Sequence, residues 1–271
     1  MPQVFPLPAG LQVLELMATG LSNWPYFVAG CGDIDITGEK KPQIIYRNVI
    51  WDDSKIEISV HEPIPEGYAE NVSGWGWPRE FPSWTWKGSE GKLLQVRVFT
   101  KAPQVKLELN GKLMGEKYLA TDDKYIAVFE VPYQPGELKA TALEDGKGTA
   151  VKTLKTSGEP ASIRLTADRN ILKDDRNDLS FVKIEVVDAE GFLVPRDSIQ
   201  LKLTLSGAGE LAASGNANPK DMSSVNRPDI KTYRGIAQAI IRPSGSGNVK
   251  LVAESQGLKT GELIIQVTER E

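Results

Sequence analysis

Short runs of alternating apolar and polar residues, separated by tight-turn dipeptides, constrain this 271-residue sequence more than any other feature. Four such runs occupy the first half: IEISV at 56–60, LQVRVF at 94–99, VKLEL at 105–109 and IAVFEV at 126–131. This period-two alternation is typical of strands with one buried face. Asn110-Gly111 and Asp145-Gly146 both favour two-residue hairpins. The pattern therefore predicts antiparallel strands with short connections.

The strand rhythm stops at SGEP, residues 157–160, and then starts again. Six further runs follow: SIRLTA at 162–167, LSFVKIEVVD at 179–188, LKLTLS at 201–206, GIAQAIIRP at 235–243, NVKLVAES at 248–255 and ELIIQVTE at 262–269. No part of this second half has a helical pattern. Each half has the strand number and spacing of an immunoglobulin-like sandwich. We expect an all-β chain of two consecutive sandwiches, residues 55–158 and 159–271, preceded by an irregular Pro- and Gly-rich segment, residues 1–54.

Composition excludes several classes of function. A net charge of -4 gives no basic face for nucleic acid, and no window approaches the roughly 18 apolar residues of a membrane helix. One cysteine, Cys31, excludes an intrachain disulfide, and one histidine, His61, cannot supply a zinc site. No cofactor is predicted. The N-terminus lacks a basic region and carries Glu15 within its apolar run, which is not the pattern of a signal peptide.

Four of the six tryptophans lie in WGWPREFPSWTWKG, residues 75–88. These are Trp75, Trp77, Trp84 and Trp86, and the prolines among them favour a rigid loop over a helix or strand. Clustered tryptophans suit a sugar-stacking platform or an apolar surface on which another domain docks. They can also pack internally, so three hypotheses stay open for this cluster, with domain docking preferred.

Two other pairs are weaker candidates for chemistry. Asp33 and Asp35 lie two residues apart and could act as paired acids, but short carboxylates in Gly-rich loops mostly cap backbone N–H groups. Cys31 and His61 could form a nucleophile and a base, although no orienting motif surrounds either residue. We favour the structural interpretation of both pairs.

Charged and polar loops complete the candidates. Lys41 and Arg47, near Tyr46, could contact a sugar acid or a phosphate, but carboxylate pairing or solvation is the ordinary role of such residues. The polar stretch from Ser214 to Tyr233 is long for a compact domain. We expect it to be mobile or to cover the sandwich.

The run GCGDIDITGEKKPQIIYRNVIW, residues 30–51, resembles the end of the catalytic barrel of family-2 glycoside hydrolases, the β-galactosidase-like group. The resemblance continues in order through the segments 75–92, 105–115, 131–147, 156–169, 178–195 and 205–219. The last of these ends in Gly215-Asn216-Ala217-Asn218-Pro219, where members of the family tend to have GNGDP. Any role that needs the usual glycine and aspartate is therefore in doubt.

The resemblance implies a retaining glycosidase whose two catalytic glutamates lie in the barrel, one of them in an Asn-Glu motif. This sequence contains no Asn-Glu dipeptide and is too short for a barrel of about 250 residues beside two sandwiches. We expect a non-catalytic C-terminal accessory region that supports the barrel, with a carbohydrate-binding module as the alternative. The implied partners are the barrel, a second copy of the chain, or carbohydrate. An exported enzyme would place it in the periplasm or outside the cell.

The resemblance also predicts how the tryptophans pack. If residues 24–51 come from the end of a barrel, their apolar side chains need a cover, and the loop at 75–86 is the nearest candidate. Trp51 and at least two of the four loop tryptophans should therefore be buried against this segment or against a neighbouring chain. Only about one helical turn is expected in residues 1–50.

Overall fold

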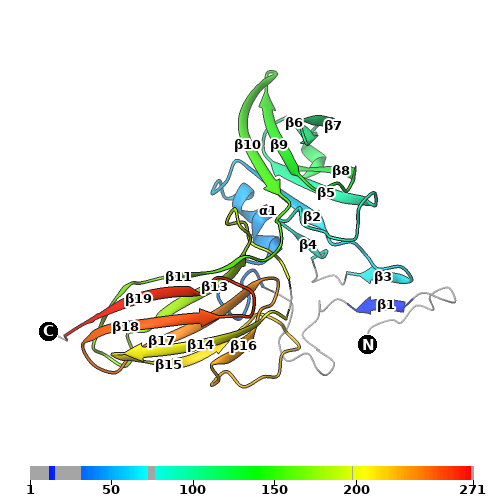
Figure 1. Cartoon of the computed structure of the whole chain (residues 1–271). Coiled ribbons are helices and arrows are strands. Elements are labelled where there is room, and N and C mark those ends of the chain that lie inside the picture. Colours follow the sequence, from blue (N-terminus) through cyan, green and yellow to red (C-terminus); the bar gives the residue numbers. More distant parts are fainter. Residues whose placement is uncertain (1–11, 16–31, 73–76, 197, 270–271) are drawn as a thin grey trace, which may run out of the picture. The chain divides into compact units, whose positions relative to one another are not determined.

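The computed structural model describes residues 12–15, 32–72, 77–196 and 198–269, and Figure 1 traces their course. The chain divides into two compact units. The first consists of residues up to Ile34 and residues 40–156, and the second of Asp35–Glu39 and residues 157–271. The division of the chain into a leader and two sandwich domains stays a prediction. Trp24, Cys31 and Trp75 lie outside the described residues.

The first unit contains two four-stranded antiparallel sheets. One has the order β4 (Glu80–Phe81), β2 (Ile56–His61), β5 (Leu93–Thr100), β8 (Ile126–Pro132), and the other β10 (Lys147–Lys155), β9 (Glu137–Glu144), β6 (Gln104–Leu109), β7 (Lys112–Tyr118). Inward-facing residues of both sheets, such as Ile58, Val96 and Leu107, form one apolar core. The alternation in the sequence thus places one face of each strand in this core.

Turn chemistry sets the hairpin registers of this unit. Asn110 and Gly111 join β6 to β7, and Asp145 and Gly146 join β9 to β10. All four residues have positive φ, between 51° and 77°. Type I′ turns require this conformation, which asparagine, aspartate and glycine tolerate best. Both predicted hairpins are present.

One helix, α1 (Pro42–Ile50), precedes the strands of the first sandwich. Pro42 occupies the first turn, where its missing N–H costs no hydrogen bond. Ile45 and Val49, four residues apart on one face, are buried against Phe99 of β5. Asp52, with φ 65°, follows the helix end at Trp51. The helix is longer than the single turn expected, because its apolar face is covered by the sheet.

Three short elements complete the first unit. They are β1 (Gln12–Glu15), its parallel partner β3 (Tyr68–Asn71), and the 3₁₀ helix η1 (Thr121–Asp123).

The second unit is also a sandwich. Its antiparallel sheet has the order β11 (Ser162–Ala167), β13 (Ser180–Val187), β17 (Ile236–Pro243), β15 (Gly209–Gly215). The facing sheet has the order β12 (Ile171–Lys173), β19 (Gly261–Thr268), β18 (Gly247–Glu254), β14 (Gln200–Gly207), β16 (Asp229–Lys231). Ile184, Leu201 and Ile241 are fully buried between them. The predicted fold class, all-β with two sandwiches, is confirmed.

Candidate functional site: a buried polar network on the first sandwich

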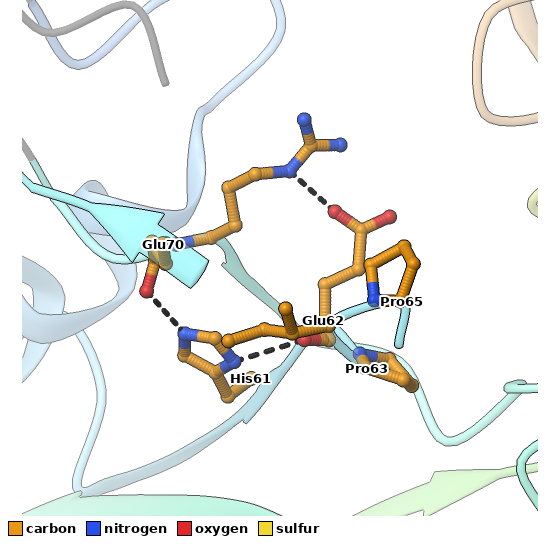
Figure 2. A pocket seen from close by; sticks show the side chains of 7 residues that line it. His61, Glu62, Pro63, Pro65 and Glu70 are labelled. Atoms are coloured by element: carbon orange, nitrogen blue, oxygen red, sulfur yellow. Dashed lines mark hydrogen bonds and ion pairs between the residues drawn. The ribbon is translucent and has the colours of Figure 1, made fainter. Parts of the chain in front are cut away.

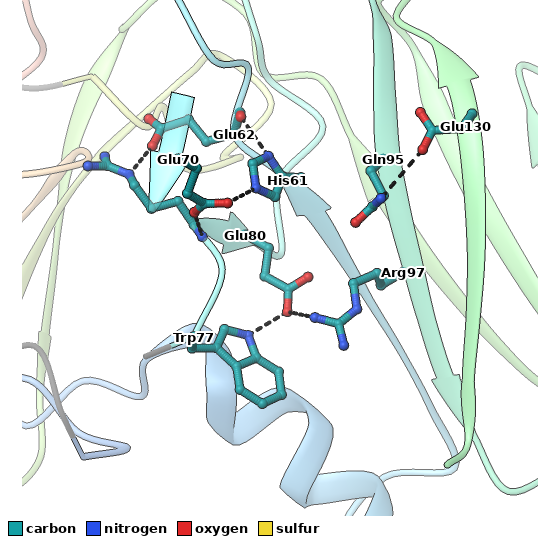
Figure 3. A network of polar contacts seen from close by, with 9 residues as sticks. His61, Glu62, Glu70, Trp77, Glu80, Gln95, Arg97 and Glu130 are labelled. Carbon is teal, nitrogen blue, oxygen red and sulfur yellow. Dashed lines mark hydrogen bonds and ion pairs between the residues drawn. The ribbon is translucent and has the colours of Figure 1, made fainter. Parts of the chain in front are cut away.

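The outer face of the β4-β2-β5-β8 sheet carries polar residues that are nevertheless buried. In β2, Ile58 and Val60 face the core, so Ser59 and His61 lie on the opposite face. The antiparallel register places Arg97 of β5 opposite Ser59, and Glu80 of β4 opposite His61. Ser59 and Glu80 are both 0% exposed. Four polar residues from three strands are therefore neighbours on this face, and Figure 3 shows three of them, His61, Glu80 and Arg97.

Glu80 is the centre of this network. Its Oε1 accepts a hydrogen bond of 2.8 Å from Arg97 Nη1 and another from the indole N–H of Trp77. The other carboxylate oxygen, Oε2, has no partner among the described residues. Burial raises the pKa of Glu80, and the nearby Arg97 and the Trp77 hydrogen bond only partly oppose this effect.

Trp77 and Arg97 also connect the network to α1. The guanidinium carbon of Arg97 lies 5.3 Å from the ring centres of both Trp77 and Phe99. The Trp77 ring lies 5.9 Å from the ring of Tyr46, a residue of α1. Cation–π and aromatic contacts of this kind add to the stabilisation from burial. The network thus helps to hold α1 on the outer face of the sheet.

A second group of charges lines a pocket of about 190 Å³ beside β2 (Figure 2). His61 Nδ1 lies 2.9 Å from the backbone oxygen of Glu62, and its Nε2 lies 2.5 Å from Glu70 Oε2. The other oxygen of Glu70 accepts the backbone N–H of Arg79 at 2.7 Å, and Arg79 Nε donates to the Glu62 carboxylate. Pro63 and its neighbours supply the apolar wall.

These contacts give the carboxylates a structural role. Retaining glycoside hydrolysis needs two carboxyl groups about 5 Å apart that face a sugar. Here Glu62, Glu70 and Glu80 each accept hydrogen bonds from a cation or a backbone N–H, and Glu80 is sealed from solvent. Within the described residues, no group of three or more His, Cys, Asp or Glu side chains could hold a metal ion. The arrangement joins elements to the sheet instead of presenting an acid and a base.

The tryptophans predicted to form a surface lie in different environments. Trp84 is 0% exposed, packs edge-on to Tyr133 with ring centres 5.1 Å apart, and donates to the backbone oxygen of Gln134. Trp86 is 8% exposed and belongs to the same sandwich core. Neither indole offers a face to a sugar in this structure. Trp77 is half-buried on α1, and its role in docking stays a prediction.

Trp51 is not buried within its own chain. We predicted burial against the segment 24–51 or against a neighbouring chain; the side chain is 64% exposed, so the first alternative is wrong and the second stays a prediction. The reason is its position at the C-terminal end of α1, beyond the face that carries Ile45 and Val49. Among the residues that the structure describes, none covers most of its side chain.

The weaker candidates Asp33, Asp35 and Tyr46 make structural contacts, whereas Cys31 lies outside the described residues and its pairing with His61 stays untested. Asp35 Oδ1 accepts from the N–H and hydroxyl of Thr37, at 2.8 and 2.7 Å, and from Glu39 N at 3.1 Å. Asp33 forms an ion pair with Arg47. The hydroxyl of Tyr46 donates to the backbone oxygen of Lys124. Neither aspartate is arranged as a catalytic acid with the other.

The polar stretch Ser214–Tyr233 contains β16 and is ordered by its own side chains. The Asn216 amide donates to Asp221 Oδ2 at 2.8 Å and to the backbone oxygen of Lys231 at 2.9 Å. Asn218 Oδ1 accepts the N–H of Lys220, a contact that an aspartate there would also make. Ala217 does not have the positive φ that would require glycine. The departure from GNGDP is thus compatible with the turn.

Sequence reasoning missed Glu70, Glu80 and Arg97. Arg97 and Ser59 occupy outward positions of alternating strands, where solvent exposure is the ordinary expectation. The sequence gives one indication that Ser59 and Arg97 are covered. It is the tryptophan-rich loop at 75–88, whose large apolar side chains could cover the outer face of the sheet. The helical spacing of Ile45 and Val49 after Pro42 was an available signal for α1.

The chain is an all-β protein of two sandwiches, and the buried charged residues of the first sandwich hold neighbouring segments against its sheet. A model described as glycoside hydrolase family 2 C-terminal domain 5 matches residues 163–264, and one described as a domain of unknown function, DUF4982, matches residues 91–150. In the described residues, no helix is long and apolar enough to cross a membrane.

The similar proteins of known name are glycoside hydrolases, in agreement with the family model that matches residues 163–264. The β-galactosidase BoGH2A of Bacteroides ovatus is 36% identical over 190 residues, which are 70% of this chain and 22% of that protein. A β-glucuronidase of Formosa agariphila is 28% identical over 179 residues, 64% of this chain and 18% of that protein. A crystal structure of a family-2 member from Bacteroides cellulosilyticus matches with a TM-score of 0.82 and 32% identity, over 88% of this chain and 32% of that one.

The chain is homologous to the C-terminal part of family-2 glycoside hydrolases. It spans about a fifth of the length of the curated relatives it matches.

Proposed function

We propose that this chain is a non-catalytic accessory region of a β-galactosidase-like family-2 glycoside hydrolase and that it supports the catalytic part of that enzyme. The observation that carries this proposal is its homology to a C-terminal fraction of much longer hydrolases. The carboxylates of the buried network are engaged in structural contacts, which agrees with a supporting role.

The exposed end of α1 is the proposed contact with the catalytic part. The helix is anchored to the sandwich through Ile45 and Val49, while Trp51 at its C-terminal end is 64% exposed. Large exposed apolar side chains beside a well-packed element favour an interface. Trp77, packed on Tyr46, supports the helix from the sandwich side.

A carbohydrate-binding role for the tryptophan cluster has less support. Sugar stacking needs an accessible indole face, but Trp84 and Trp86 are in the core and the Trp77 N–H is bound to Glu80. Three of the four clustered tryptophans are therefore poor candidates for a platform.

Two measurements test the proposal. The chain by itself should not hydrolyse aryl β-galactosides, β-glucosides or β-glucuronides above background; turnover that survives repurification and disappears on mutating a carboxylate pair would overturn it. A chimera should then be made in which this chain replaces the homologous part of the Bacteroides ovatus β-galactosidase. Trp51→Ala should lower the stability or activity of the chimera, whereas Tyr118→Ala, at an aromatic residue on β7 that is 78% exposed, should not.

A further inference from the structure

The sequence contains one Asn-Gly dipeptide, Asn110-Gly111, and one Asp-Gly dipeptide, Asp145-Gly146, and each forms a hairpin turn of the first unit. In such dipeptides the glycine nitrogen can attack the side-chain carbonyl carbon of the preceding residue, because glycine has no Cβ to hinder the approach. The new C–N bond closes a succinimide ring and expels ammonia from asparagine or water from aspartic acid. Addition of water to the ring then gives aspartate or isoaspartate. Both turns are therefore candidate sites of this spontaneous modification.

The two turns share a backbone conformation but differ at the reacting side chain. Asn110 and Asp145 both have φ 51°, and the glycines that follow them have φ 77° and 75°. Both residues are exposed to solvent. The Asp145 carboxylate makes no hydrogen bond or ion pair with any residue that the structure describes. Asp145 is thus an internal reference for the effect of the turn alone on the reaction.

The Asn110 side chain, in contrast, is held by the loop between β8 and β9. Its Oδ1 accepts the backbone N–H of Glu137 at 2.8 Å, and its Nδ2 donates to the backbone oxygen of Pro135 at 3.1 Å. Gly136 leaves the space that the amide occupies, because a Cβ at this position would overlap the Asn110 side chain. Ring closure brings Cγ to bonding distance of the Gly111 nitrogen, so the amide has to turn away from both hydrogen-bond partners.

The loop that holds Asn110 is itself fixed to the sandwich core. The Gly136 N–H donates to Thr156 Oγ1 at 3.0 Å, and this hydroxyl donates to the backbone oxygen of Trp84 at 2.6 Å. The indole N–H of Trp84, a fully buried residue, donates to the backbone oxygen of Gln134 at 2.9 Å. Because the loop is fixed at these points, it does not follow the Asn110 amide when the amide turns.

We propose that Asn110 is a latent deamidation site, closed in the folded chain by the loop at Pro135–Glu137, and that Asp145 is the open site of isoaspartate formation. Two hydrogen bonds of ordinary strength should slow the reaction at Asn110 by about 5- to 150-fold relative to a turn without them. Deamidation also removes the anchor, because a carboxylate oxygen has no proton to donate to the Pro135 oxygen. The reaction at Asn110 thus separates the β6–β7 hairpin from the loop irreversibly.

Peptide mapping by mass spectrometry tests the difference between the two turns. The whole chain is incubated at neutral pH, once folded in buffer and once unfolded in concentrated urea, and the reaction rate is measured at each dipeptide. The ratio of the unfolded rate to the folded rate removes the intrinsic difference between asparagine and aspartate. This ratio should be about 5- to 150-fold larger at Asn110 than at Asp145. Equal ratios at the two sites would overturn the proposal.

Gly136→Ala tests the role of the loop, because its Cβ displaces the Asn110 amide without changing either residue of the dipeptide. The folded variant should deamidate at Asn110 about 5- to 150-fold faster than the wild type, with an unchanged rate at Asp145. Gly245→Ala is the matched control. Its φ of 149° is close to the 138° of Gly136, so the backbone strain is similar, but a Cβ there meets nothing within 4 Å.

Circular dichroism establishes that both variants are folded before the rates are compared. A wild-type rate at Asn110 in folded Gly136→Ala, or an equal acceleration in Gly245→Ala, would contradict protection by the loop. If Gly136→Ala does not fold, the comparison of the two dipeptides in the wild-type chain decides the proposal without it.

Discussion

The two sandwiches bury polar side chains in different places. In the first, Ser59 of β2 and Glu80 of the short edge strand β4 lie on the outer sheet face. The two buried side-chain atoms without a partner in the described residues, Ser59 Oγ and Glu80 Oε2, belong to them. In the second, Ser180 and Asp188 lie at strand ends and are hydrogen-bonded to neighbouring loops. Every β-sandwich needs polar side chains at its strand ends to hydrogen-bond the loops that connect the strands. A polar sheet face under a helix is an additional feature of the first sandwich.

The buried polar face of the first sandwich is explained by the segments that pack on it. The outer face of the first sandwich receives α1 and Trp77, and it does so through Glu80 and Arg97. Buried charges of this kind contribute little net stability but make the loss of one partner expensive. Since all six tryptophans lie within the residue range of the first unit, their fluorescence reports the unfolding of that unit alone.

The largest effect should come from breaking the buried ion pair. Arg97→Met leaves the Glu80 carboxylate buried without its cation and should lower the free energy of unfolding of the first unit by about 3–5 kcal/mol. Denaturation followed by tryptophan fluorescence measures this loss. In the second unit, Arg164→Met breaks an ion pair with Glu185 in which the arginine side chain is 44% exposed, and should cost at most about 1 kcal/mol. Equal losses would show that the two faces do not differ.

Substitution of Asp188 tests how much the hydrogen bonds between a strand end and its neighbouring loops stabilise the second sandwich. Its carboxylate accepts the N–H groups of Gly158, Glu190 and Phe192, at 2.7, 3.0 and 2.9 Å. Asp188→Asn removes one acceptor and the charge, so it should cost about 1–3 kcal/mol. Calorimetry should detect the loss in the second unit, with the tryptophan transition unchanged. A shift of the tryptophan transition instead would contradict the assignment.

The same residue predicts a pH dependence. Burial would raise the pKa of Asp188, but the backbone hydrogen bonds, led by that of Gly158, outweigh it and hold the pKa below its ordinary value. A lowered pKa stabilises the fold above the unfolded value of about 3.9, and this contribution is lost as the pH falls through the folded value. Thermal unfolding in acid should therefore show a smaller pH dependence in Asp188→Asn than in the wild type.

Two fully buried serines, one in each unit, allow a matched comparison in which smaller changes of the free energy of unfolding are expected. Ser180 Oγ hydrogen-bonds the backbone oxygen of Arg169 at 2.9 Å, so Ser180→Ala should cost about 1 kcal/mol in the second unit. Ser59 Oγ has no partner in the described residues, so Ser59→Ala should be neutral or slightly stabilising in the first. A clear loss in Ser59→Ala would mean that an ordered water satisfies this hydroxyl.

The smallest effect should be at Trp51. Because its side chain is 64% exposed, Trp51→Ala should change the free energy of unfolding by no more than about 0.5 kcal/mol. Urea denaturation of the chain by itself measures this value. A large loss would place the indole in a packing role that the proposed interface does not require.

The sequence by itself determined the strands, the hairpins and the family. Alternation over five or six residues and the dipeptides Asn110-Gly111 and Asp145-Gly146 act through local backbone geometry, so they predict structure without knowledge of distant contacts. Only the tertiary structure decided which face of each strand was covered. Ser59 and Arg97 look like solvent-facing residues until α1 and Trp77 lie over them. Trp84 and Trp51 carry the same side chain, yet one is in the core and the other is exposed, because burial depends on segments that are distant along the chain.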